Sequence, residues 1–209
     1  MILYRLCQGI VRVASPFICR LEVRGLEHLP RAGPFLLVSN HQSILDPILI
    51  QAICPRVVHT MAKSTQFAAP GFGWLMPRIA SFPVRRYQVD PQAVRIALRR
   101  LRAGKPVGIY LEGERSWDGR LQAPRLGAIR LILKAGVPVV PCTIAGSYDV
   151  WPRWHRSLRR APVRVTFAAP LRFPRCDERG QREALLAQAT ARTLAVLQQP
   201  LQTALPAGP

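Results

Sequence analysis

Short apolar runs alternate along the chain with amphipathic segments. Six apolar runs have the length and composition of buried strands: residues 35–39, 57–61, 79–84, 106–111, 138–144 and 163–167. Four segments show helical periodicity: residues 46–53, 91–102, 126–135 and 177–198, the last capped by Asp177. Strands that alternate with helices predict an α/β fold with a largely parallel or mixed central sheet flanked by helices.

The pattern predicts one main domain. No internal repeat, low-complexity block or long linker divides the chain. We expect the domain to span residues 25–199, after an N-terminal segment at 1–24 and before a flexible Pro/Ala-rich tail at 200–209.

The N-terminal segment is apolar up to residue 18, where Arg5 and Arg12 interrupt it and Pro16 is expected to end it. It fits an amphipathic helix lying on a membrane, and equally a helix packed on the domain. It lacks the small-residue cleavage site of a signal peptide. No apolar run reaches the roughly 18 residues of a membrane-spanning helix, so we expect none.

Charge narrows the choice of partners. The 209 residues include 30 Lys and Arg against 11 Asp and Glu, which gives a net charge of +19. Such a surface favours phosphate-bearing partners: nucleic acid, anionic lipid or phosphorylated small molecules. The five cysteines and four histidines are scattered without metal or redox spacing, so we expect reduced thiols and no metal site.

One imidazole and one carboxylate stand five positions apart, as His41 and Asp46. The predicted strand at 35–39 leads into this run, and Asp46-Pro47 opens the next helix, so His41 lies in a strand-to-helix loop. A carboxylate on one ring nitrogen leaves the other free to accept a proton, which makes a general base. The same spacing also fits a loop histidine beside an aspartate that caps the helix.

Three other loops follow predicted strands or flank one: residues 81–86, 110–119 and 137–141. Loops that follow parallel strands gather at one edge of the sheet, so we expect them to converge on His41. The first loop ends in Arg85-Arg86, and the second carries Gly113 and Arg115. Arginine forks and a close backbone suit a phosphate group, although each element alone also fits ordinary surface or core.

Taken together, these runs resemble the four ordered blocks of the lysophosphatidic acid acyltransferase family. The resemblance spans roughly residues 25–152. Residues 40–46 match its Asn-His-x4-Asp block, which implies that His41 and Asp46 form the catalytic dyad. Residues 82–86 resemble its second block, 110–116 its third and 137–141 its fourth, with Arg125 and Gly127 resembling a basic-x-Gly step before the last. The implied substrate-binding residues are Arg86, Glu112, Gly113, Arg115, Ser116 and Arg125.

Two positions depart from the family pattern. Leu111 stands where the family usually has Pro, and Glu114 where it usually has Thr. Glu114 places a second carboxylate beside the expected anion site. The departure leaves open a different lipid acceptor.

The resemblance implies a glycerol-3-phosphate acyltransferase-like fold and transfer of a fatty acyl group to a lysophospholipid. The expected acceptor is 1-acyl-sn-glycerol 3-phosphate, and the expected product is phosphatidic acid. The donor would be a thioester of coenzyme A or of acyl carrier protein, used as co-substrate with no bound cofactor. We expect peripheral or monotopic association with an anionic membrane surface at its cytoplasmic face.

Two alternatives use other residues. A nucleic-acid-binding module would use the basic stretch with Trp151 and Trp154, which contains four arginines: Arg153, Arg156, Arg159 and Arg160. No helix-turn-helix, RRM or zinc pattern accompanies it, and we expect no nucleic-acid partner. A serine hydrolase would pair His41 with Ser39, Ser43 or Ser147, but the chain has no Gly-x-Ser-x-Gly elbow.

Overall fold

A seven-stranded mixed sheet forms the centre of the protein, with the strand order β1-β7-β6-β2-β5-β3-β4. The computed structural model describes residues 2–88, 90–155, 157–174 and 182–203. The strands are β1 (Cys19–Arg24), β2 (Leu36–Ser39), β3 (His59–Lys63), β4 (Ser81–Val84), β5 (Val107–Tyr110), β6 (Val139–Ala145) and β7 (Ala161–Phe167). Only the β6–β7 pair is antiparallel among these, which confirms the predicted α/β class.

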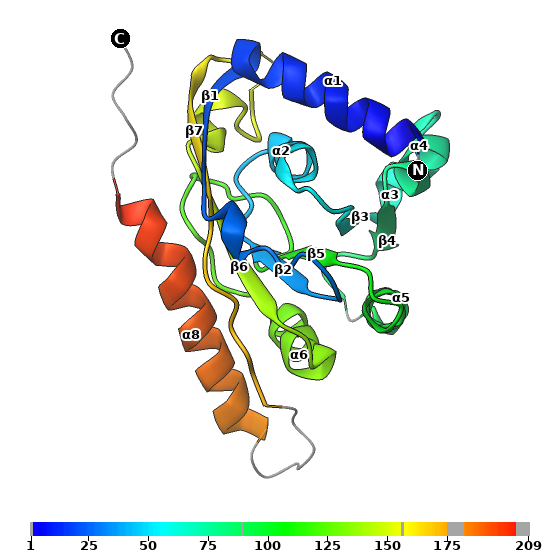
Figure 1. Ribbon diagram of the computed structural model, residues 1–209, viewed down its shortest axis with the longest axis vertical. Helices are drawn as coiled ribbons and strands as arrows, with labels where there is room; N and C mark the ends of the chain where they lie inside the picture. Colours follow the sequence, from blue (N-terminus) through cyan, green and yellow to red (C-terminus); the bar gives the residue numbers. More distant parts are fainter. Residues whose placement is uncertain (1, 89, 156, 175–181, 204–209) are drawn as a thin grey trace.

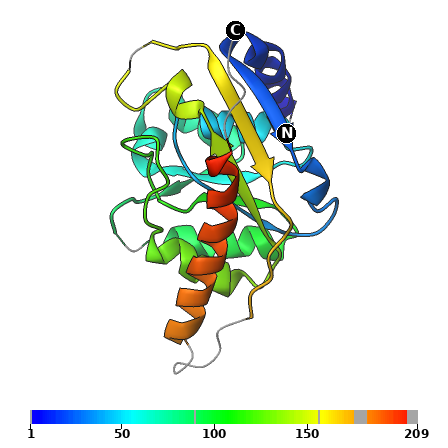
Figure 2. The same ribbon diagram turned by 90° about the vertical axis from the view of Figure 1, so that its left-hand side faces the viewer.

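Helices cover both faces of the sheet (Figure 1). They are α1 (Ile2–Ile18), α2 (Leu45–Ile53), α3 (Ser64–Ala68), α4 (Phe72–Arg78), α5 (Pro91–Arg102), α6 (Leu126–Ala135), α7 (Ser147–Val150) and α8 (Arg182–Gln202), with a 3-10 turn η1 at Leu26–His28. One apolar core lies between the sheet and α2, and a second lies between the sheet and α5, α6 and α8. Figure 2 shows α8 running alongside the sheet, on the face that α5 and α6 also cover.

Every strand and helix predicted from the described residues is present, within a few residues of its expected bounds. The bounds of α5 and α6 are those predicted. The cap predicted at Asp177 lies outside the described residues. Helix α8 continues to Gln202, beyond the expected end at residue 198, and α1 continues past Pro16 to Ile18.

Besides the 3-10 turn η1, four short elements were not predicted: β1, α3, α4 and α7. Strand β1 lies inside the segment 1–24, for which only a helix was expected, and it pairs with β7 at the edge of the sheet. Its sequence does alternate, with Cys19, Leu21 and Val23 between charged residues, so a strand signal was present. A six-residue edge strand gives too short a pattern to stand out beside a long apolar helix.

Strands β5, β2 and β6 are parallel neighbours, and this arrangement brings their loops together. Ser39, the last residue of β2, lies opposite Tyr110 of β5 and Cys142 of β6. The loops that follow the three strands therefore leave the same edge of the sheet, as predicted for residues 110–119. The prediction was wrong for residues 137–141: they lead into β6 and form its first half, and Val139 lies opposite Leu36 at the start of β2, so this segment begins at the opposite edge.

Helix α1 packs on α2 through polar side chains. Nε2 of Gln8 donates to the carbonyl oxygens of Gln51 (2.8 Å) and Cys54 (2.9 Å). Nε of Arg12 donates to the Ala52 carbonyl at 2.6 Å. These bonds satisfy carbonyl groups at the C-terminal end of α2, which have no partner within their own helix. Helix α1 therefore packs on the domain through its polar face.

The apolar face of α1 points outward. Its large apolar side chains are between 58% and 89% exposed: Ile2, Leu6, Ile10, Val13 and Phe17. A contiguous apolar stripe of this kind on a surface marks contact with something other than water. In the part of the chain that the structure describes, no helix has the length and apolar character needed to cross a bilayer.

Candidate active site

The side chains of His41 and Asp46 form a buried hydrogen-bonded pair. Nδ1 of His41 lies 2.7 Å from Oδ2 of Asp46, and the two residues are only 5% and 0% exposed. The same carboxylate oxygen accepts backbone N–H groups from Gln42 (2.6 Å) and Ser43 (2.8 Å). Asp46 therefore fixes the loop as well as the ring. With Nδ1–H directed at the carboxylate, Nε2 is the ring nitrogen that can accept a proton.

The surroundings of His41 keep its ring uncharged. Burial lowers the pKa of His41, Asp46 opposes that effect, and the positive charges of Arg86 and Arg115 lower the pKa further. A neutral imidazole at neutral pH has the protonation state of a general base.

Tyr110 and Asn40 hold the base of the loop. The ring of Tyr110 stacks on His41 with 3.9 Å between centroids and 18° between planes. The Asn40 side chain pairs with both backbone groups of Ile144: its Nδ2 donates to the carbonyl and its Oδ1 accepts from the N–H, each at 2.8 Å. Asn40 thus continues the pairing of β2 with β6 by one residue. Sequence reasoning assigned no role to either residue, although both lie in matched blocks.

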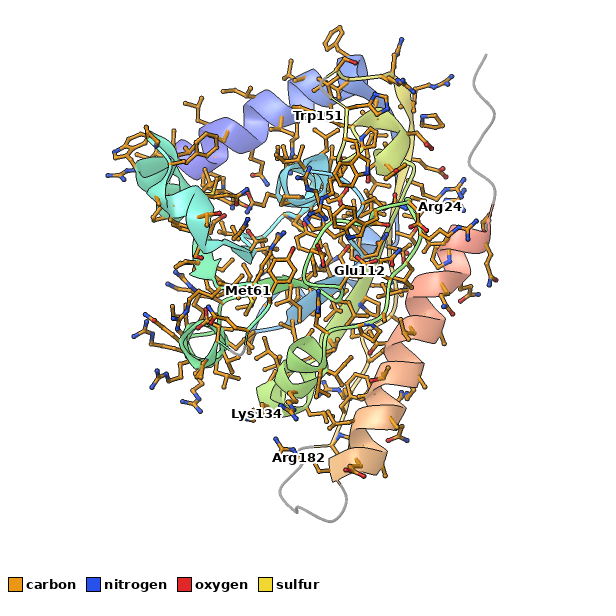
Figure 3. All side chains as sticks on the ribbon, turned by 180° about the vertical axis from the view of Figure 1, so that it is seen from behind. Arg24, Met61, Glu112, Lys134, Trp151 and Arg182 are labelled. Atoms are coloured by element: carbon orange, nitrogen blue, oxygen red, sulfur yellow. The ribbon has the colours of Figure 1, made fainter. Side chains whose placement is uncertain are left out.

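Glu112 is almost completely buried, near the centre of the molecule (Figure 3). Its Oε2 accepts the backbone N–H of His41 at 2.6 Å, and its Oε1 accepts that of Gln122 at 2.8 Å. Burial raises the pKa of Glu112 to about 7, against these two bonds. The carboxylate connects the loop after β2 with the loop after β5.

Gly113 and Ser116 also help to connect the loop after β5 with the loop after β2. Gly113 has a φ of 73°, and a Cβ there would lie 3.0 Å from Cγ of Arg125. The backbone N–H of Ser116 donates to the His41 carbonyl at 2.7 Å, while its hydroxyl donates to the Arg120 carbonyl at 2.7 Å. Of the predicted site residues, Glu112, Gly113 and Ser116 therefore shape the loops around His41.

Arg86 and Arg115 come from the loops after β4 and β5 and are both partly buried. Burial lowers the pKa of each guanidinium, and each lowers the pKa of His41. Nε of Arg86 is buried with no hydrogen-bond partner among the described residues. Two guanidinium groups held close to a general base provide donors and positive charge for an anion.

Glu114 forms ion pairs with two further arginines, Arg125 and Arg153. Its carboxylate accepts from Arg125 at 2.9 Å, from Arg153 at 3.1 Å and from the Tyr87 hydroxyl at 2.8 Å. Arg153, which sequence reasoning did not place in the site, also donates to the Arg115 carbonyl at 3.1 Å. Glu114 thus pairs with two cations at the edge of the site, and Arg125 is one of them.

The residues behind the two alternatives are used differently. Arg153 packs 3.8 Å from the centre of the Trp117 ring, and Arg156 lies outside the described residues. The hydroxyls of Ser39 and Ser43 donate to the carbonyls of Asn40 and Trp151. Ser147 donates to Asp46. These bonds give no support to a serine nucleophile activated by His41. Within the described ranges, no cluster of three or more His, Cys, Asp or Glu could hold a metal ion.

A solved structure supports the fold. The crystal structure of the 1-acyl-sn-glycerophosphate (LPA) acyltransferase PlsC from Thermotoga maritima superimposes with a TM-score of 0.75 at 23% identity. The match covers 93% of this chain and 79% of that one.

Sequence comparison gives the family. The chain is 33% identical over 164 residues to a chloroplastic 1-acyl-sn-glycerol-3-phosphate acyltransferase of Arabidopsis thaliana, which is 76% of this chain and 45% of that protein. It is 30% identical over 157 residues to the human 1-acyl-sn-glycerol-3-phosphate acyltransferase alpha, 73% of this chain and 55% of that protein. The chain thus spans about half the length of these relatives. The family model described as Acyltransferase matches residues 20–145, so the chain belongs to the acyltransferase family.

Proposed function

We propose that this protein transfers a fatty acyl group from an acyl thioester to the hydroxyl of 1-acyl-sn-glycerol 3-phosphate, giving phosphatidic acid. The observation that carries the proposal is the buried His41–Asp46 pair with Arg86 and Arg115 close enough to lower the pKa of His41. A base beside two guanidinium groups suits an acceptor that carries a hydroxyl and a phosphate. The names of these two relatives agree with this acceptor.

In the proposed reaction, His41 carries the proton transfers. Nε2 of His41 takes the hydroxyl proton as the oxygen attacks the thioester carbonyl, while Asp46 holds Nδ1–H and stabilises the imidazolium that forms. The tetrahedral intermediate collapses, the C–S bond breaks, and the thiolate leaves and recovers the proton from His41. Because a thiol has a pKa of about 8.5, the thiolate leaves without a strong general acid. The reaction therefore requires no covalent intermediate on the protein.

The acceptor phosphate would lie against Arg86 and Arg115. Their charges lower the pKa of His41, whereas Arg125 and Arg153 are paired with Glu114. Glu114, the departure from the family pattern, thus neutralises peripheral arginines and leaves the central two for the substrate. Positioning of the hydroxyl by its own phosphate supplies much of the rate enhancement in such reactions.

The acyl donor would be a thioester of coenzyme A or of acyl carrier protein, present only as co-substrate. The two carriers share the thioester that the mechanism needs. A comparison of acyl-coenzyme A with acyl-acyl carrier protein at equal concentration distinguishes them through kcat/KM.

The lipid acceptor and the exposed face of α1 both favour a membrane surface. Leu6 and Val13 are 58% and 71% exposed, and they belong to a stripe that would enter the headgroup boundary. The net charge of +19 adds attraction to anionic lipid, at about 1 kcal/mol for each Lys or Arg near the surface. Peripheral association with the cytoplasmic leaflet would bring the site to its substrate without a spanning helix.

A panel of lysophospholipids tests the reaction. Purified protein is given labelled acyl thioester with lysophosphatidic acid, lysophosphatidylglycerol or lysophosphatidylethanolamine, and the products are identified by mass spectrometry. We expect transfer to lysophosphatidic acid, with kcat reduced about 10³-fold in His41→Ala because general base catalysis is lost. Transfer to another acceptor would correct the substrate, and a folded protein inactive on the whole panel would refute the proposal.

A further inference from the structure

The catalytic carboxylate has a partner that lies outside all four sequence blocks. Oγ of Ser147 donates to Oδ1 of Asp46 at 2.6 Å, and both residues are 0% exposed. Ser147 follows β6 and begins α7. Sequence reasoning considered it only as a nucleophile.

The hydroxyl of Ser147 donates its one hydrogen bond to Asp46. The other nearby acceptor, Oε1 of Gln42, is 3.4 Å from Oγ, which is much longer than the bond to the carboxylate. A hydroxyl donates one hydrogen bond, and a bond to an ionised acceptor is the stronger one.

The two oxygens of Asp46 are supported differently. Oδ2 accepts from the His41 ring and from two backbone N–H groups, those of Gln42 and Ser43. All three donors lie at residues 41–43, in the loop between β2 and α2. Oδ1 accepts a hydrogen bond from the hydroxyl of Ser147, which is 101 residues away in sequence and lies at the start of α7. Ser147 is therefore the support that ties the carboxylate to the rest of the fold.

The place of Ser147 is set by the sheet. Strand β6 lies beside β2, and the Asn40 side chain continues their pairing up to Ile144. Gly146 then takes a φ of 85°, which turns the chain into α7 and places Ser147 under the loop. The hydroxyl thus belongs to a segment separate from the loop that carries His41.

We propose that Ser147 is a positioning residue for the reaction: it fixes the orientation of the Asp46 carboxylate and, through it, that of the His41 ring. This inference rests on the proposed function of the dyad. Without the hydroxyl, a fully buried carboxylate oxygen loses its anchor. The carboxylate then rotates about its Cβ–Cγ bond, and the Nε2 lone pair is less well directed at the acceptor hydroxyl.

The central test compares Ser147→Ala with Ser147→Thr. We expect Ser147→Ala to lower kcat about tenfold, because small errors in the placement of reacting groups are costly. KM for lysophosphatidic acid should stay within about twofold, because Ser147 is behind Asp46 and does not reach substrate. Ser147→Thr keeps the hydroxyl and should restore most of kcat. An unchanged kcat in Ser147→Ala, or a change confined to KM, would overturn the inference.

Thr143→Val is the matched control. Thr143 lies in β6, is also buried, and donates its hydroxyl to the Leu197 carbonyl of α8 at 3.0 Å, away from the site. Both variants lose one buried hydrogen bond, so both should unfold at a lower temperature. Only Ser147→Ala should lose kcat, and an equal loss in Thr143→Val would show general destabilisation instead. If Ser147→Ala does not fold, Ser147→Cys replaces it, with a smaller loss of kcat expected from its weaker donor and an unchanged kcat overturning the inference.

A measurement without substrate separates this inference from the proposed function. The Nδ1–H proton of His41 gives a downfield NMR signal that depends on its bond to Asp46. The signal should shift or broaden in Ser147→Ala and stay unchanged in Thr143→Val, whether or not the wild type acylates any lysolipid. Identical spectra in all three proteins would overturn the positioning role, whereas a wild type inactive on the whole panel would refute the proposed function alone.

Discussion

The loop around His41 and helix α1 both bury polar side chains, but with opposite consequences for their surroundings. In the loop, Asp46 and Glu112 are buried and bonded from several sides, and the result is one directed ring nitrogen. In α1, Gln8 and Arg12 bond to α2, and the result is an apolar face directed outward. Buried polar contacts thus fix the position of an element in the fold. The exposed face of the element indicates which kind of partner it can contact.

Asp46→Asn should have the largest effect on the catalytic side of this comparison. In the wild type, three N–H groups share the Oδ2 oxygen of Asp46: one from the His41 ring and one each from the backbone of Gln42 and Ser43. An asparagine would place there either an NH2 donor or an uncharged oxygen, which accepts more weakly than a carboxylate. The His41 ring would therefore lose its orientation. We expect kcat to fall about 10³-fold. Steady-state kinetics with saturating acyl donor measure it, and Asp149→Asn, an exposed residue of α7, is the control. A loss below tenfold would mean that the carboxylate does not direct the ring.

Charges on the outer face of α1 test the other region. The double variant Leu6→Asp/Val13→Asp should reduce the affinity for anionic vesicles by ten- to a hundredfold or more, since an apolar side chain contributes about 1.5–3 kcal/mol when buried. Sedimentation with vesicles measures the affinity, and thermal unfolding should change little because both positions are exposed. Leu126→Asp, at a 51% exposed leucine of α6 on the opposite face of the sheet, is the matched control. Equal binding by all three proteins would contradict a membrane role for α1.

Glu112→Gln decides between two roles for a buried residue of the site. The amide nitrogen would face the N–H group of His41 or of Gln122, and one bond between the loops would be lost. We expect kcat to fall about tenfold with KM for the acceptor nearly unchanged, since Glu112 positions the loop. A rise in KM at constant kcat would instead indicate direct contact with substrate. Glu183→Gln, on the exposed side of α8, controls for loss of charge.

The pH dependence should show the smallest effect. Burial and two arginines lower the pKa of His41, so the base form persists below the ordinary pKa of 6.5 and activity is lost as pH falls through the lowered value. The acid limb of kcat/KM should therefore lie below pH 6.5. The limb of kcat should lie at higher pH, because the bound phosphate offsets the charges of Arg86 and Arg115.

Glu112 also titrates near neutrality, since burial raises its pKa to about 7. Measuring the same profiles in Glu112→Gln removes that group and leaves the limb of His41. A remaining limb at or above pH 6.5 in kcat/KM would contradict the electrostatic environment described for the ring.

The sequence was sufficient to predict elements whose stabilising contacts come from residues close by in the chain. Helix α5 begins at Pro91 because Asp90 accepts the N–H groups of Gln92 and Ala93, and one face supplies its apolar contacts. Strand β1 was missed because its short alternating pattern follows directly on a long apolar helix. The dyad was found because both of its members lie in one short run.

The sequence by itself determined the alternation of strands and helices, the basic surface and the His41–Asp46 pair, because each is written in residues close along the chain. Only the tertiary structure decided which arginines remain for an anion, that Glu112 faces backbone rather than solvent, and that Ser147 holds Asp46 across 101 positions. It also decided which face of α1 is buried. Hydrophobic periodicity identifies a face, but its direction depends on the partners that the rest of the fold places beside it.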